Sequence, residues 1–288
     1  MIIIRISGGL GNQMFQYALG RVLSLKNKTE LKLDTHFYDL KTEKDRTFSL
    51  HNYNIKGSIS LEQDFKKINI PHSSQNSLLS KFLRKLSNKI ILENNFIFNP
   101  KILEIKNNCY LSGVWQSEKY FKGFEEIIKK DFTLKNKPSL ETENWLKKIS
   151  EGNSVSIHIR RGDYINNQKT NTLHGILNMD YYKKAIDFIN SKTTSPVFFV
   201  FSDDIEWAKQ NLKINHQTFF VSNANILDYE EIIIMSKCRH NIIANSTFSW
   251  WGAWLNENNA KIVITPKEWF KSKIIDTKDL IPENWLKI

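Results

Sequence analysis

The sequence predicts an α/β protein built around parallel β-sheets. In the second half, short apolar runs alternate with stretches whose apolar residues recur at helical spacing, from residue 155 to residue 265. The first half opens with an apolar run, a glycine-rich loop and a helical pattern. Strands that alternate with helices in this way predict a parallel sheet with right-handed crossovers.

The composition is that of a globular protein and leaves several partner classes open. The chain has 288 residues, enough for two domains or one large one, and carries a net charge of +11. A basic surface is compatible with nucleic acid, anionic lipid or anionic small molecules. The two cysteines form no C-x-x-C motif, which favours a reducing compartment and no disulfide framework or zinc site. No apolar run approaches the roughly 20 residues that cross a bilayer, so we expect a cytoplasmic protein, soluble or peripheral at the inner membrane face.

The chain begins with a predicted strand at residues 2–6, a glycine loop and a helix. Glycines at a helix start let backbone N–H groups approach an anionic ligand, and the loop ends in Gly11. Asn12 and Gln13 add side-chain donors and acceptors for a sugar or a phosphate. The loop is not G-x-G-x-x-G, so it lacks the dinucleotide fingerprint. A tight turn that needs glycine only for its geometry is the alternative.

The rest of the first half is less regular. We predict strands at residues 31–34 and 110–115 and helices at residues 121–130 and 140–149, the second capped by Ser139. Residues 82–90 have the pattern of a basic amphipathic helix, suited either to a membrane surface or to a solvated basic face. A turn at residues 151–153 places a domain boundary near residue 150, which gives domains 1–150 and 151–288.

The second half has a clearer rhythm. Strands are predicted at residues 155–160, 197–201, 218–221, 240–244 and 260–265. Between them lie predicted helices, the first capped by Asp180 and the others over residues 205–212, 229–236 and 250–255.

The strand at residues 155–160 is the centre of the functional argument. One face is apolar, whereas the other carries His158 and Arg160. Arg161, Gly162 and Asp163 follow at its carboxyl end, where open α/β sheets bind ligands. Guanidinium groups donate in a planar fork that suits phosphate. The alternative is a surface strand whose arginines pair with acids.

Two further strand ends carry polar clusters. Asp203 and Asp204 can accept from the N–H groups of guanine, or can simply cap the following helix. Residues 246–249 supply hydroxyls and backbone N–H groups at a helix start, which suits a diphosphate. Parallel strands bring such ends to one edge, so the three clusters together predict a nucleotide pocket. The members of the third cluster are Ser246, Thr247, Phe248 and Ser249.

These motifs, in this order, resemble the α1,2- and α1,6-fucosyltransferases, and the chain looks like a bacterial α1,2-fucosyltransferase. The resemblance rests on His158-Ile159-Arg160-Arg161-Gly162-Asp163, Gly8-Gly9-Leu10-Gly11-Asn12-Gln13, Phe201-Ser202-Asp203-Asp204 and Asn245-Ser246-Thr247-Phe248-Ser249-Trp250-Trp251-Gly252. It implies a GT-B architecture, with two Rossmann-like domains facing a central cleft. The first would be the acceptor-side domain and the second the GDP-fucose-binding domain.

The resemblance also implies an inverting galactoside 2-α-L-fucosyltransferase that uses GDP-β-L-fucose and needs no cofactor or metal. The acceptor would be a galactose-containing oligosaccharide or lipid-linked glycan, as in surface glycan or O-antigen synthesis. The sequence contains no D-x-D triplet, in agreement with a metal-free site.

The resemblance implies a role for each motif. Arg160 would hold the β-phosphate, supported by Arg161, and His158 would contact the nucleotide. Asp203 and Asp204 would read guanine, and residues 246–249 would hold the pyrophosphate. Asn12, with Gly11 beside it, would reach the donor from the first domain. Asp163 is the first candidate for the general base, with orientation of an arginine as its alternative role.

Two other classes of function compete with a transferase. A basic nucleic-acid-binding protein would gather its cations and aromatics on one element, whereas the lysines here are scattered. A non-catalytic sugar- or nucleotide-binding module would not need all three strand-end clusters.

Overall fold

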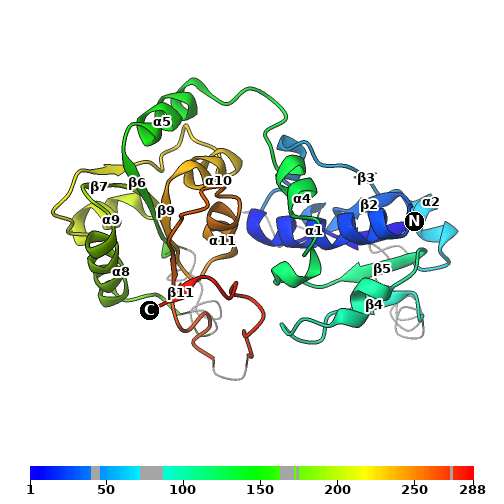
Figure 1. Cartoon of the computed structure of the whole chain (residues 1–288). Helices are drawn as coiled ribbons and strands as arrows, with labels where there is room; N and C mark the ends of the chain where they lie inside the picture. Colours follow the sequence, from blue (N-terminus) through cyan, green and yellow to red (C-terminus); the bar gives the residue numbers. More distant parts are fainter. Residues whose placement is uncertain (40–45, 72–86, 163–171, 173–174, 273–274) are drawn as a thin grey trace. The chain divides into compact units, whose positions relative to one another are not determined.

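The computed structural model describes residues 1–39, 46–71, 87–162, 172, 175–272 and 275–288 (Figure 1). The chain forms two compact α/β units. Unit 1 comprises Met1–Asn136 and Asp276–Leu280, and unit 2 comprises Lys137–Ile275 and Ile281–Ile288. Each contains a parallel sheet, so the predicted α/β class with two Rossmann-like units is confirmed. Within the described residues, no helix combines the length and the apolar character needed to span a membrane.

In unit 1, the described strands form a five-stranded parallel sheet in the order β3-β2-β1-β5-β4. The strands are β1 (Ile2–Arg5), β2 (Leu31–Asp34), β3 (Ser58–Ile59), β4 (Ile90–Leu92) and β5 (Cys109–Ser112). The helices are α1 (Leu10–Lys26), α2 (Glu62–Lys67) and α4 (Glu125–Asp131), with 3₁₀ turns η1 (His36–Asp39), η3 (Leu50–Asn52), η4 (Pro100–Glu104) and η5 (Glu118–Tyr120).

Both faces of β1 are covered, which explains its uninterrupted apolar run. Ile3 packs in a cluster with Phe65 of α2, whereas Ile4 contacts α1 at Gly20. A Cβ on Gly20 would lie 2.9 Å from Ile4 Cγ2, so glycine there lets the helix approach the sheet closely. Residues 6–9 join the end of β1 to the start of α1.

In unit 2, the described strands form a six-stranded parallel sheet in the order β11-β10-β9-β6-β7-β8. The strands are β6 (Asn153–Ile159), β7 (Pro196–Ser202), β8 (Thr218–Phe220), β9 (His240–Ile242), β10 (Val263–Thr265) and β11 (Leu286–Lys287). The helices are α5 (Leu140–Ser150), α8 (Met179–Lys192), α9 (Ile205–Asn211), α10 (Asp228–Lys237) and α11 (Thr247–Trp254).

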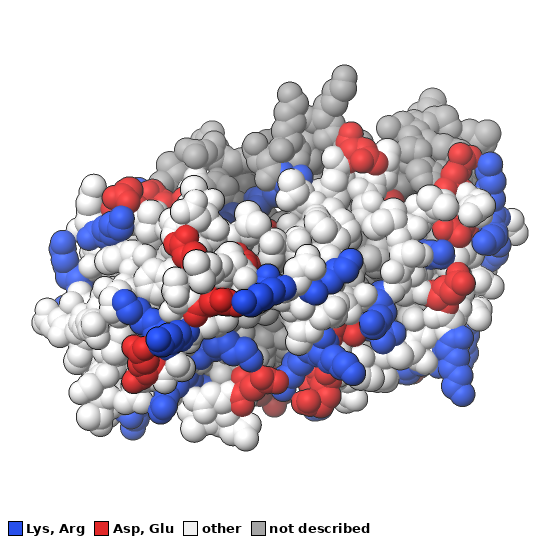
Figure 2. All heavy atoms as spheres, turned by 90° about the horizontal axis from the view of Figure 1, so that it is seen from above, with Lys and Arg blue, Asp and Glu red and all other residues white. Residues whose placement is uncertain are grey.

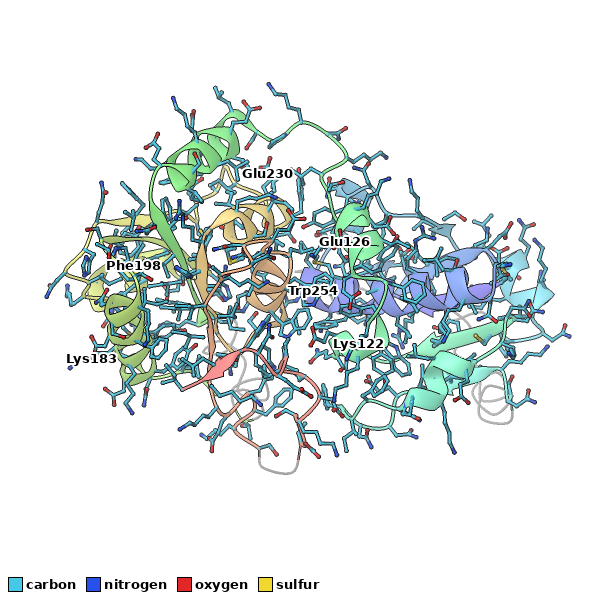
Figure 3. All side chains as sticks on the ribbon, in the orientation of Figure 1. Lys122, Glu126, Lys183, Phe198, Glu230 and Trp254 are labelled. Carbon is cyan, nitrogen blue, oxygen red and sulfur yellow. The ribbon has the colours of Figure 1, made fainter. Side chains whose placement is uncertain are left out.

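Strand β6 is buried on both faces, although its sequence alternates apolar and polar residues. Its apolar face packs against α8 and α9, and Phe198 of β7 joins the same core, whereas Lys183 of α8 lies exposed on the outer side (Figure 3). On the polar face, Asn241 of β9 donates to the Ser156 hydroxyl at 2.7 Å and to the carbonyl of Met235 in α10 at 2.9 Å. Ser156 is therefore buried inside the unit and hydrogen-bonded to it.

The boundary between the units differs from the prediction near residue 150. It lies between Asn136 and Lys137 because α5 packs with unit 2. At the start of α5, the Ser139 N–H and hydroxyl donate to Glu230 of α10 at 2.6 and 3.0 Å. Ser139 also caps α5 as predicted, accepting from the Thr142 N–H.

A short segment late in the chain belongs to unit 1. Asp279 accepts from the Phe98 N–H at 2.9 Å and pairs with Lys119 at 2.7 Å, and its carbonyl accepts from the Ser117 hydroxyl. Burial alone would raise the pKa of Asp279, but its hydrogen bonds to Lys119 and Phe98 hold that pKa below its usual value. We call residues 276–280 the strap.

Three local expectations were wrong or incomplete. Asn178, not Asp180, caps α8 by accepting from the Tyr181 N–H. Residues 82–90 were predicted to form a helix, but Ile90 begins strand β4, which pairs in parallel with β5. Residues 82–86 lie outside the described residues. The two-residue strands β3 and β11 carry too short a pattern to be recognised in the sequence.

Candidate functional site

The order of the strands in unit 2 reverses between β6 and β9. The chain runs from β6 through β7 to β8 on one side and from β9 through β10 to β11 on the other. Open parallel sheets bind ligands outside the carboxyl ends of the strands at such a point. Arg160 follows β6 there, and residues 245–249 follow β9. The rings of His158 and Phe248 have centroids 5.5 Å apart, so these two motifs lie together.

The two arginines have different surroundings. Arg161 lies with its guanidinium carbon 4.2 Å from the centre of the Trp207 ring, and its Nε is 3.3 Å from Asp204 Oδ2. Arg160 Nε is 3.3 Å from Asp203 Oδ2, and about a fifth of its side chain is exposed (20%). Stacking and pairing hold Arg161 against α9, whereas Arg160 lies at the reversal point itself.

The two aspartates are engaged by the chain. Asp203 accepts from the backbone N–H groups of Arg161 and Gly162 at 2.9 and 3.0 Å, which fixes the turn after β6. Asp204 caps α9 by accepting from the Trp207 N–H at 3.3 Å. The helix-cap alternative therefore describes Asp204, and Asp203 holds the turn after β6. Asp163 lies outside the described residues.

The serine cluster is part of helix α11. The helix begins at Thr247, three residues before the predicted start, with Ser246 as its N-cap accepting from the Phe248 N–H at 3.4 Å. Ser249 is 1% exposed and donates to the Ser246 carbonyl, so its hydroxyl is used inside the helix. Trp250 and Trp251 are fully buried, as predicted for core residues. Within this cluster, the first turn of α11 is the part that can bind an anion, because a helix N-terminus carries partial positive charge.

Glu231 of α10 is a candidate site residue that the sequence reasoning missed. Burial raises its pKa to about 7; the Ser222 hydroxyl and Arg160 oppose this rise, whereas Asp228 and Asp203 add to it. These neighbours place the Glu231 carboxylate at the same sheet edge as Arg160. The available signal was the acidic stretch Asp228-Tyr229-Glu230-Glu231 directly before the apolar run at residues 232–235.

Unit 1 has a reversal point of its own. Its strand order changes direction between β1 and β5, next to the start of α1. Gly11 and Asn12 lie inside the first turn of this helix, not in the loop before it. The Asn12 side chain accepts from Gln116 Nε2 at 3.0 Å, and Gln116 follows β5. Asn12 is thus tied to the polar edge of its own sheet.

A search of solved structures supports the fold. Fucosyltransferase NodZ from Bradyrhizobium superposes with a TM-score of 0.51 at 12% sequence identity, over 87% of this chain and 91% of NodZ. NodZ alpha-1,6-fucosyltransferase co-crystallized with GDP gives a TM-score of 0.52, also at 12% identity, over 88% and 91%. At such low identity the likeness shows the fold alone.

Comparison of sequences identifies the family. O-antigen biosynthesis glycosyltransferase WbnK of Escherichia coli is 36% identical, covering 98% of this chain and 99% of WbnK. Alpha-1,2-colitosyltransferase of Escherichia coli is 33% identical, over 100% and 99%. Human Galactoside alpha-(1,2)-fucosyltransferase 1 is 27% identical over 50% of this chain and 42% of its own length. The family model described as Glycosyl transferase family 11 matches residues 1–288. The chain is therefore a glycosyltransferase that belongs to glycosyl transferase family 11.

Proposed function

We propose that the protein transfers L-fucose from GDP-β-L-fucose to the 2-hydroxyl of a terminal galactoside, with inversion, in O-antigen or other surface-glycan synthesis. The observation that carries the proposal is Arg160 at the end of β6, where the His158–Phe248 contact also brings the first turn of α11. A guanidinium group and a helix N-terminus together suit a leaving diphosphate. The names of the relatives supply the sugar and linkage: α1,2-fucosyl and α1,2-colitosyl transfer.

In this proposal the residues of unit 2 divide the work. Arg160 meets the charge that grows on the β-phosphate as the donor bond breaks, and Arg161 keeps the turn in place through Trp207. His158 contacts the nucleotide, and Ser246 and Thr247 meet the pyrophosphate at the start of α11. Arginine supplies the positive charge, so we propose that no metal is required.

Guanine recognition is proposed to reside on Glu231. Asp203 and Asp204 hold the backbone, whereas Glu231 presents a third carboxylate at this edge. An ionised carboxylate accepts two N–H bonds from guanine, and adenine offers no such pair. Replacement by glutamine should therefore weaken GDP binding and reduce discrimination against ADP. Thermal shift with each nucleotide measures both effects, and unchanged GDP affinity would remove Glu231 from this role.

The decisive experiment pairs donors with acceptors. Purified protein is incubated with GDP-fucose or a colitosyl donor and a panel of galactosides, and the product linkage is determined by NMR. We expect an α1,2-linked fucosyl product. Colitosyl transfer alone would establish the second candidate, which the 33% identical α1,2-colitosyltransferase favours.

Nucleic-acid binding is the other alternative. Over the face seen in Figure 2, Lys and Arg are interspersed with Asp and Glu, unlike the single-sign stripe expected of a nucleic-acid surface. GDP should raise the melting temperature, whereas short DNA should not.

A further inference from the structure

The turns that follow β6 and β7 lie side by side at the carboxyl edge of the unit 2 sheet. The two strands pair in parallel, and the last pair in their register is Ile159 with Ser202. Arg160 and Asp203 are the next residues along the two chains, so they leave the sheet together. Arg160 Nε is 3.3 Å from Asp203 Oδ2, and the two side chains are 20% and 23% exposed. This ion pair is therefore brought together by the register of the sheet and is partly shielded from water.

The Asp203 carboxylate is fixed by the backbone of the neighbouring turn. Its Oδ1 accepts from the Arg161 N–H at 2.9 Å, and its Oδ2 accepts from the Gly162 N–H at 3.0 Å. A Cβ on Gly162 would lie 3.1 Å from Oδ2 and 3.3 Å from Cγ of Asp203, so glycine leaves the carboxylate room to approach. An exposed ion pair contributes little because both side chains must be ordered to form it. Here one partner is already ordered by the backbone, so Asp203 can hold the Arg160 guanidinium in one place.

A second arginine–aspartate pair lies beside the first. Arg161 Nε is 3.3 Å from Asp204 Oδ2, the same distance as in the first pair. Arg161 also stacks on the Trp207 ring at 4.2 Å, and Asp204 caps α9. The second pair therefore anchors the turn to α9, whereas the first pair holds the arginine that lies at the reversal point.

A contact at Nε suits an arginine that presents its other donors to an anion. A guanidinium carries one N–H on Nε and four on its two Nη atoms. Holding the group at Nε restricts the orientation of its plane, and the planar fork binds a phosphate with two prongs only in the right orientation. Preorganised donors stabilise developing charge because they need no rearrangement as the bond breaks. The orientation of Arg160 should therefore matter more for turnover than for donor binding.

We propose that Asp203 is a positioning residue, which orients Arg160 toward the phosphate that leaves with GDP and so sets the rate of transfer. This inference rests on the role proposed for Arg160. Loss of the Asp203 charge should not by itself weaken donor binding, because a carboxylate repels a diphosphate. The kinetic signature is a lower kcat with an unchanged or lower donor KM. A turn that simply lost its shape would raise the donor KM as well.

The test compares Asp203→Asn with Asp204→Asn, using whichever donor the wild-type protein accepts. Each change removes one carboxylate charge 3.3 Å from an arginine Nε and leaves an oxygen for the backbone N–H groups. We expect Asp203→Asn to lose on the order of 100-fold in kcat, the effect of a reacting group misplaced by about 1 Å. Asp204→Asn should mainly lower the melting temperature. Equal losses of kcat in the two variants overturn the assignment, because both residues would then act through the fold of the turns.

A double-mutant cycle shows whether Asp203 acts through Arg160. If it does, Asp203→Asn should cost little further kcat in a protein that already carries Arg160→Lys, because the oriented fork is absent there. Independent roles would instead multiply the two losses of kcat, and that outcome overturns the proposal.

Gly162→Ala moves the carboxylate without removing a charge. The added methyl would lie 3.1 Å from Asp203 Oδ2, closer than ordinary contact, so the carboxylate must shift. We expect kcat to fall roughly tenfold. The matched control is Gly152→Ala, directly before β6, where the methyl would lie at an ordinary 3.6 Å from Val197 Cγ2 and kcat should equal that of wild type. Wild-type turnover in Gly162→Ala contradicts the positioning role.

A measurement that does not require turnover separates this role from the identity of the donor. The Nε–H signal of Arg160, assigned through Arg160→Lys, should be rigid in ¹H–¹⁵N heteronuclear NOE spectra of the wild type and mobile in Asp203→Asn. The same mobility in both proteins overturns the positioning role even if the enzyme transfers fucose. A signal that loosens, in a protein that transfers neither fucose nor colitose, keeps the role and refutes the proposed donors instead.

Discussion

Replacing Glu231 with glutamine should stabilise the unliganded protein at alkaline pH. Burial raises its pKa from the ordinary 4.5 to about 7 in the folded state. Between these values the folded protein holds the proton that the unfolded chain has lost, so stability falls as pH rises. Above pH 7 the penalty is complete, and a shift of about 2.5 units corresponds to about 3 kcal/mol. Below pH 4.5 both states are protonated and the penalty vanishes.

The assay is thermal melting of wild type and Glu231→Gln at pH 5 and pH 8. We expect the variant to melt several degrees higher at pH 8, since 1 kcal/mol shifts the melting temperature by roughly 2–4 °C in domains of 150–250 residues, and to gain much less at pH 5. Glu230→Gln is the matched control: it weakens a charge-assisted hydrogen bond to Ser139 and should lower stability. A Glu231 variant that melts at a lower temperature than wild type at pH 8 would refute the reasoning. The buried carboxylate would then not destabilise the unliganded protein, and no such destabilisation would need to be offset by ligand binding.

Three other outcomes are expected. Arg160→Lys should lose on the order of 100-fold in kcat with a smaller change in donor KM, because lysine lacks the planar fork. Arg161→Lys should mainly lower the stability of the fold. Near-normal turnover in Arg160→Lys would contradict the assignment of Arg160 as the phosphate ligand. Activity should persist in EDTA; abolition by chelator with rescue by manganese would show a metal requirement. Gly113→Ala places a methyl 2.4 Å from Glu93 Cβ and should lower the free energy of unfolding, measured in urea, by roughly 1–3 kcal/mol. An unfolding midpoint equal to that of wild type would disprove this.

The centre of unit 2 followed from the sequence because β6 and β7 are each seven residues long and carry clear strand patterns. The apolar run of β7 (Pro196–Ser202) and the alternation in β6 predicted both strands, and therefore which loops lie at the same edge of the sheet. Burial of His158 was not predictable from the same pattern, since alternation alone suggests a solvated polar face. Helices on both sides of the sheet bury that face and turn its polar residues into an internal network.

The chemistry of individual carboxylates was harder to predict. Asp203 and Glu231 are both acids near strand ends, and only the hydrogen bonds distinguish a carboxylate that holds the backbone from one that is desolvated. Strand β4 was missed because it is three residues long and follows a basic segment with a helical pattern. Its pairing with β5, which brings Glu93 to Val114 and Trp115, depends on a contact distant in sequence.

The strap limits how this protein can be recombined with its relatives. The chain passes from unit 2 into unit 1 at residue 276 and returns after residue 280. A chimera with a single breakpoint at residue 136 would therefore combine one parent's Ser117 and Lys119 with the other parent's strap, and mismatches would fall on the Asp279 contacts. Exchange of unit 1 between family members should preserve the fold only when residues 276–280 travel with residues 1–136.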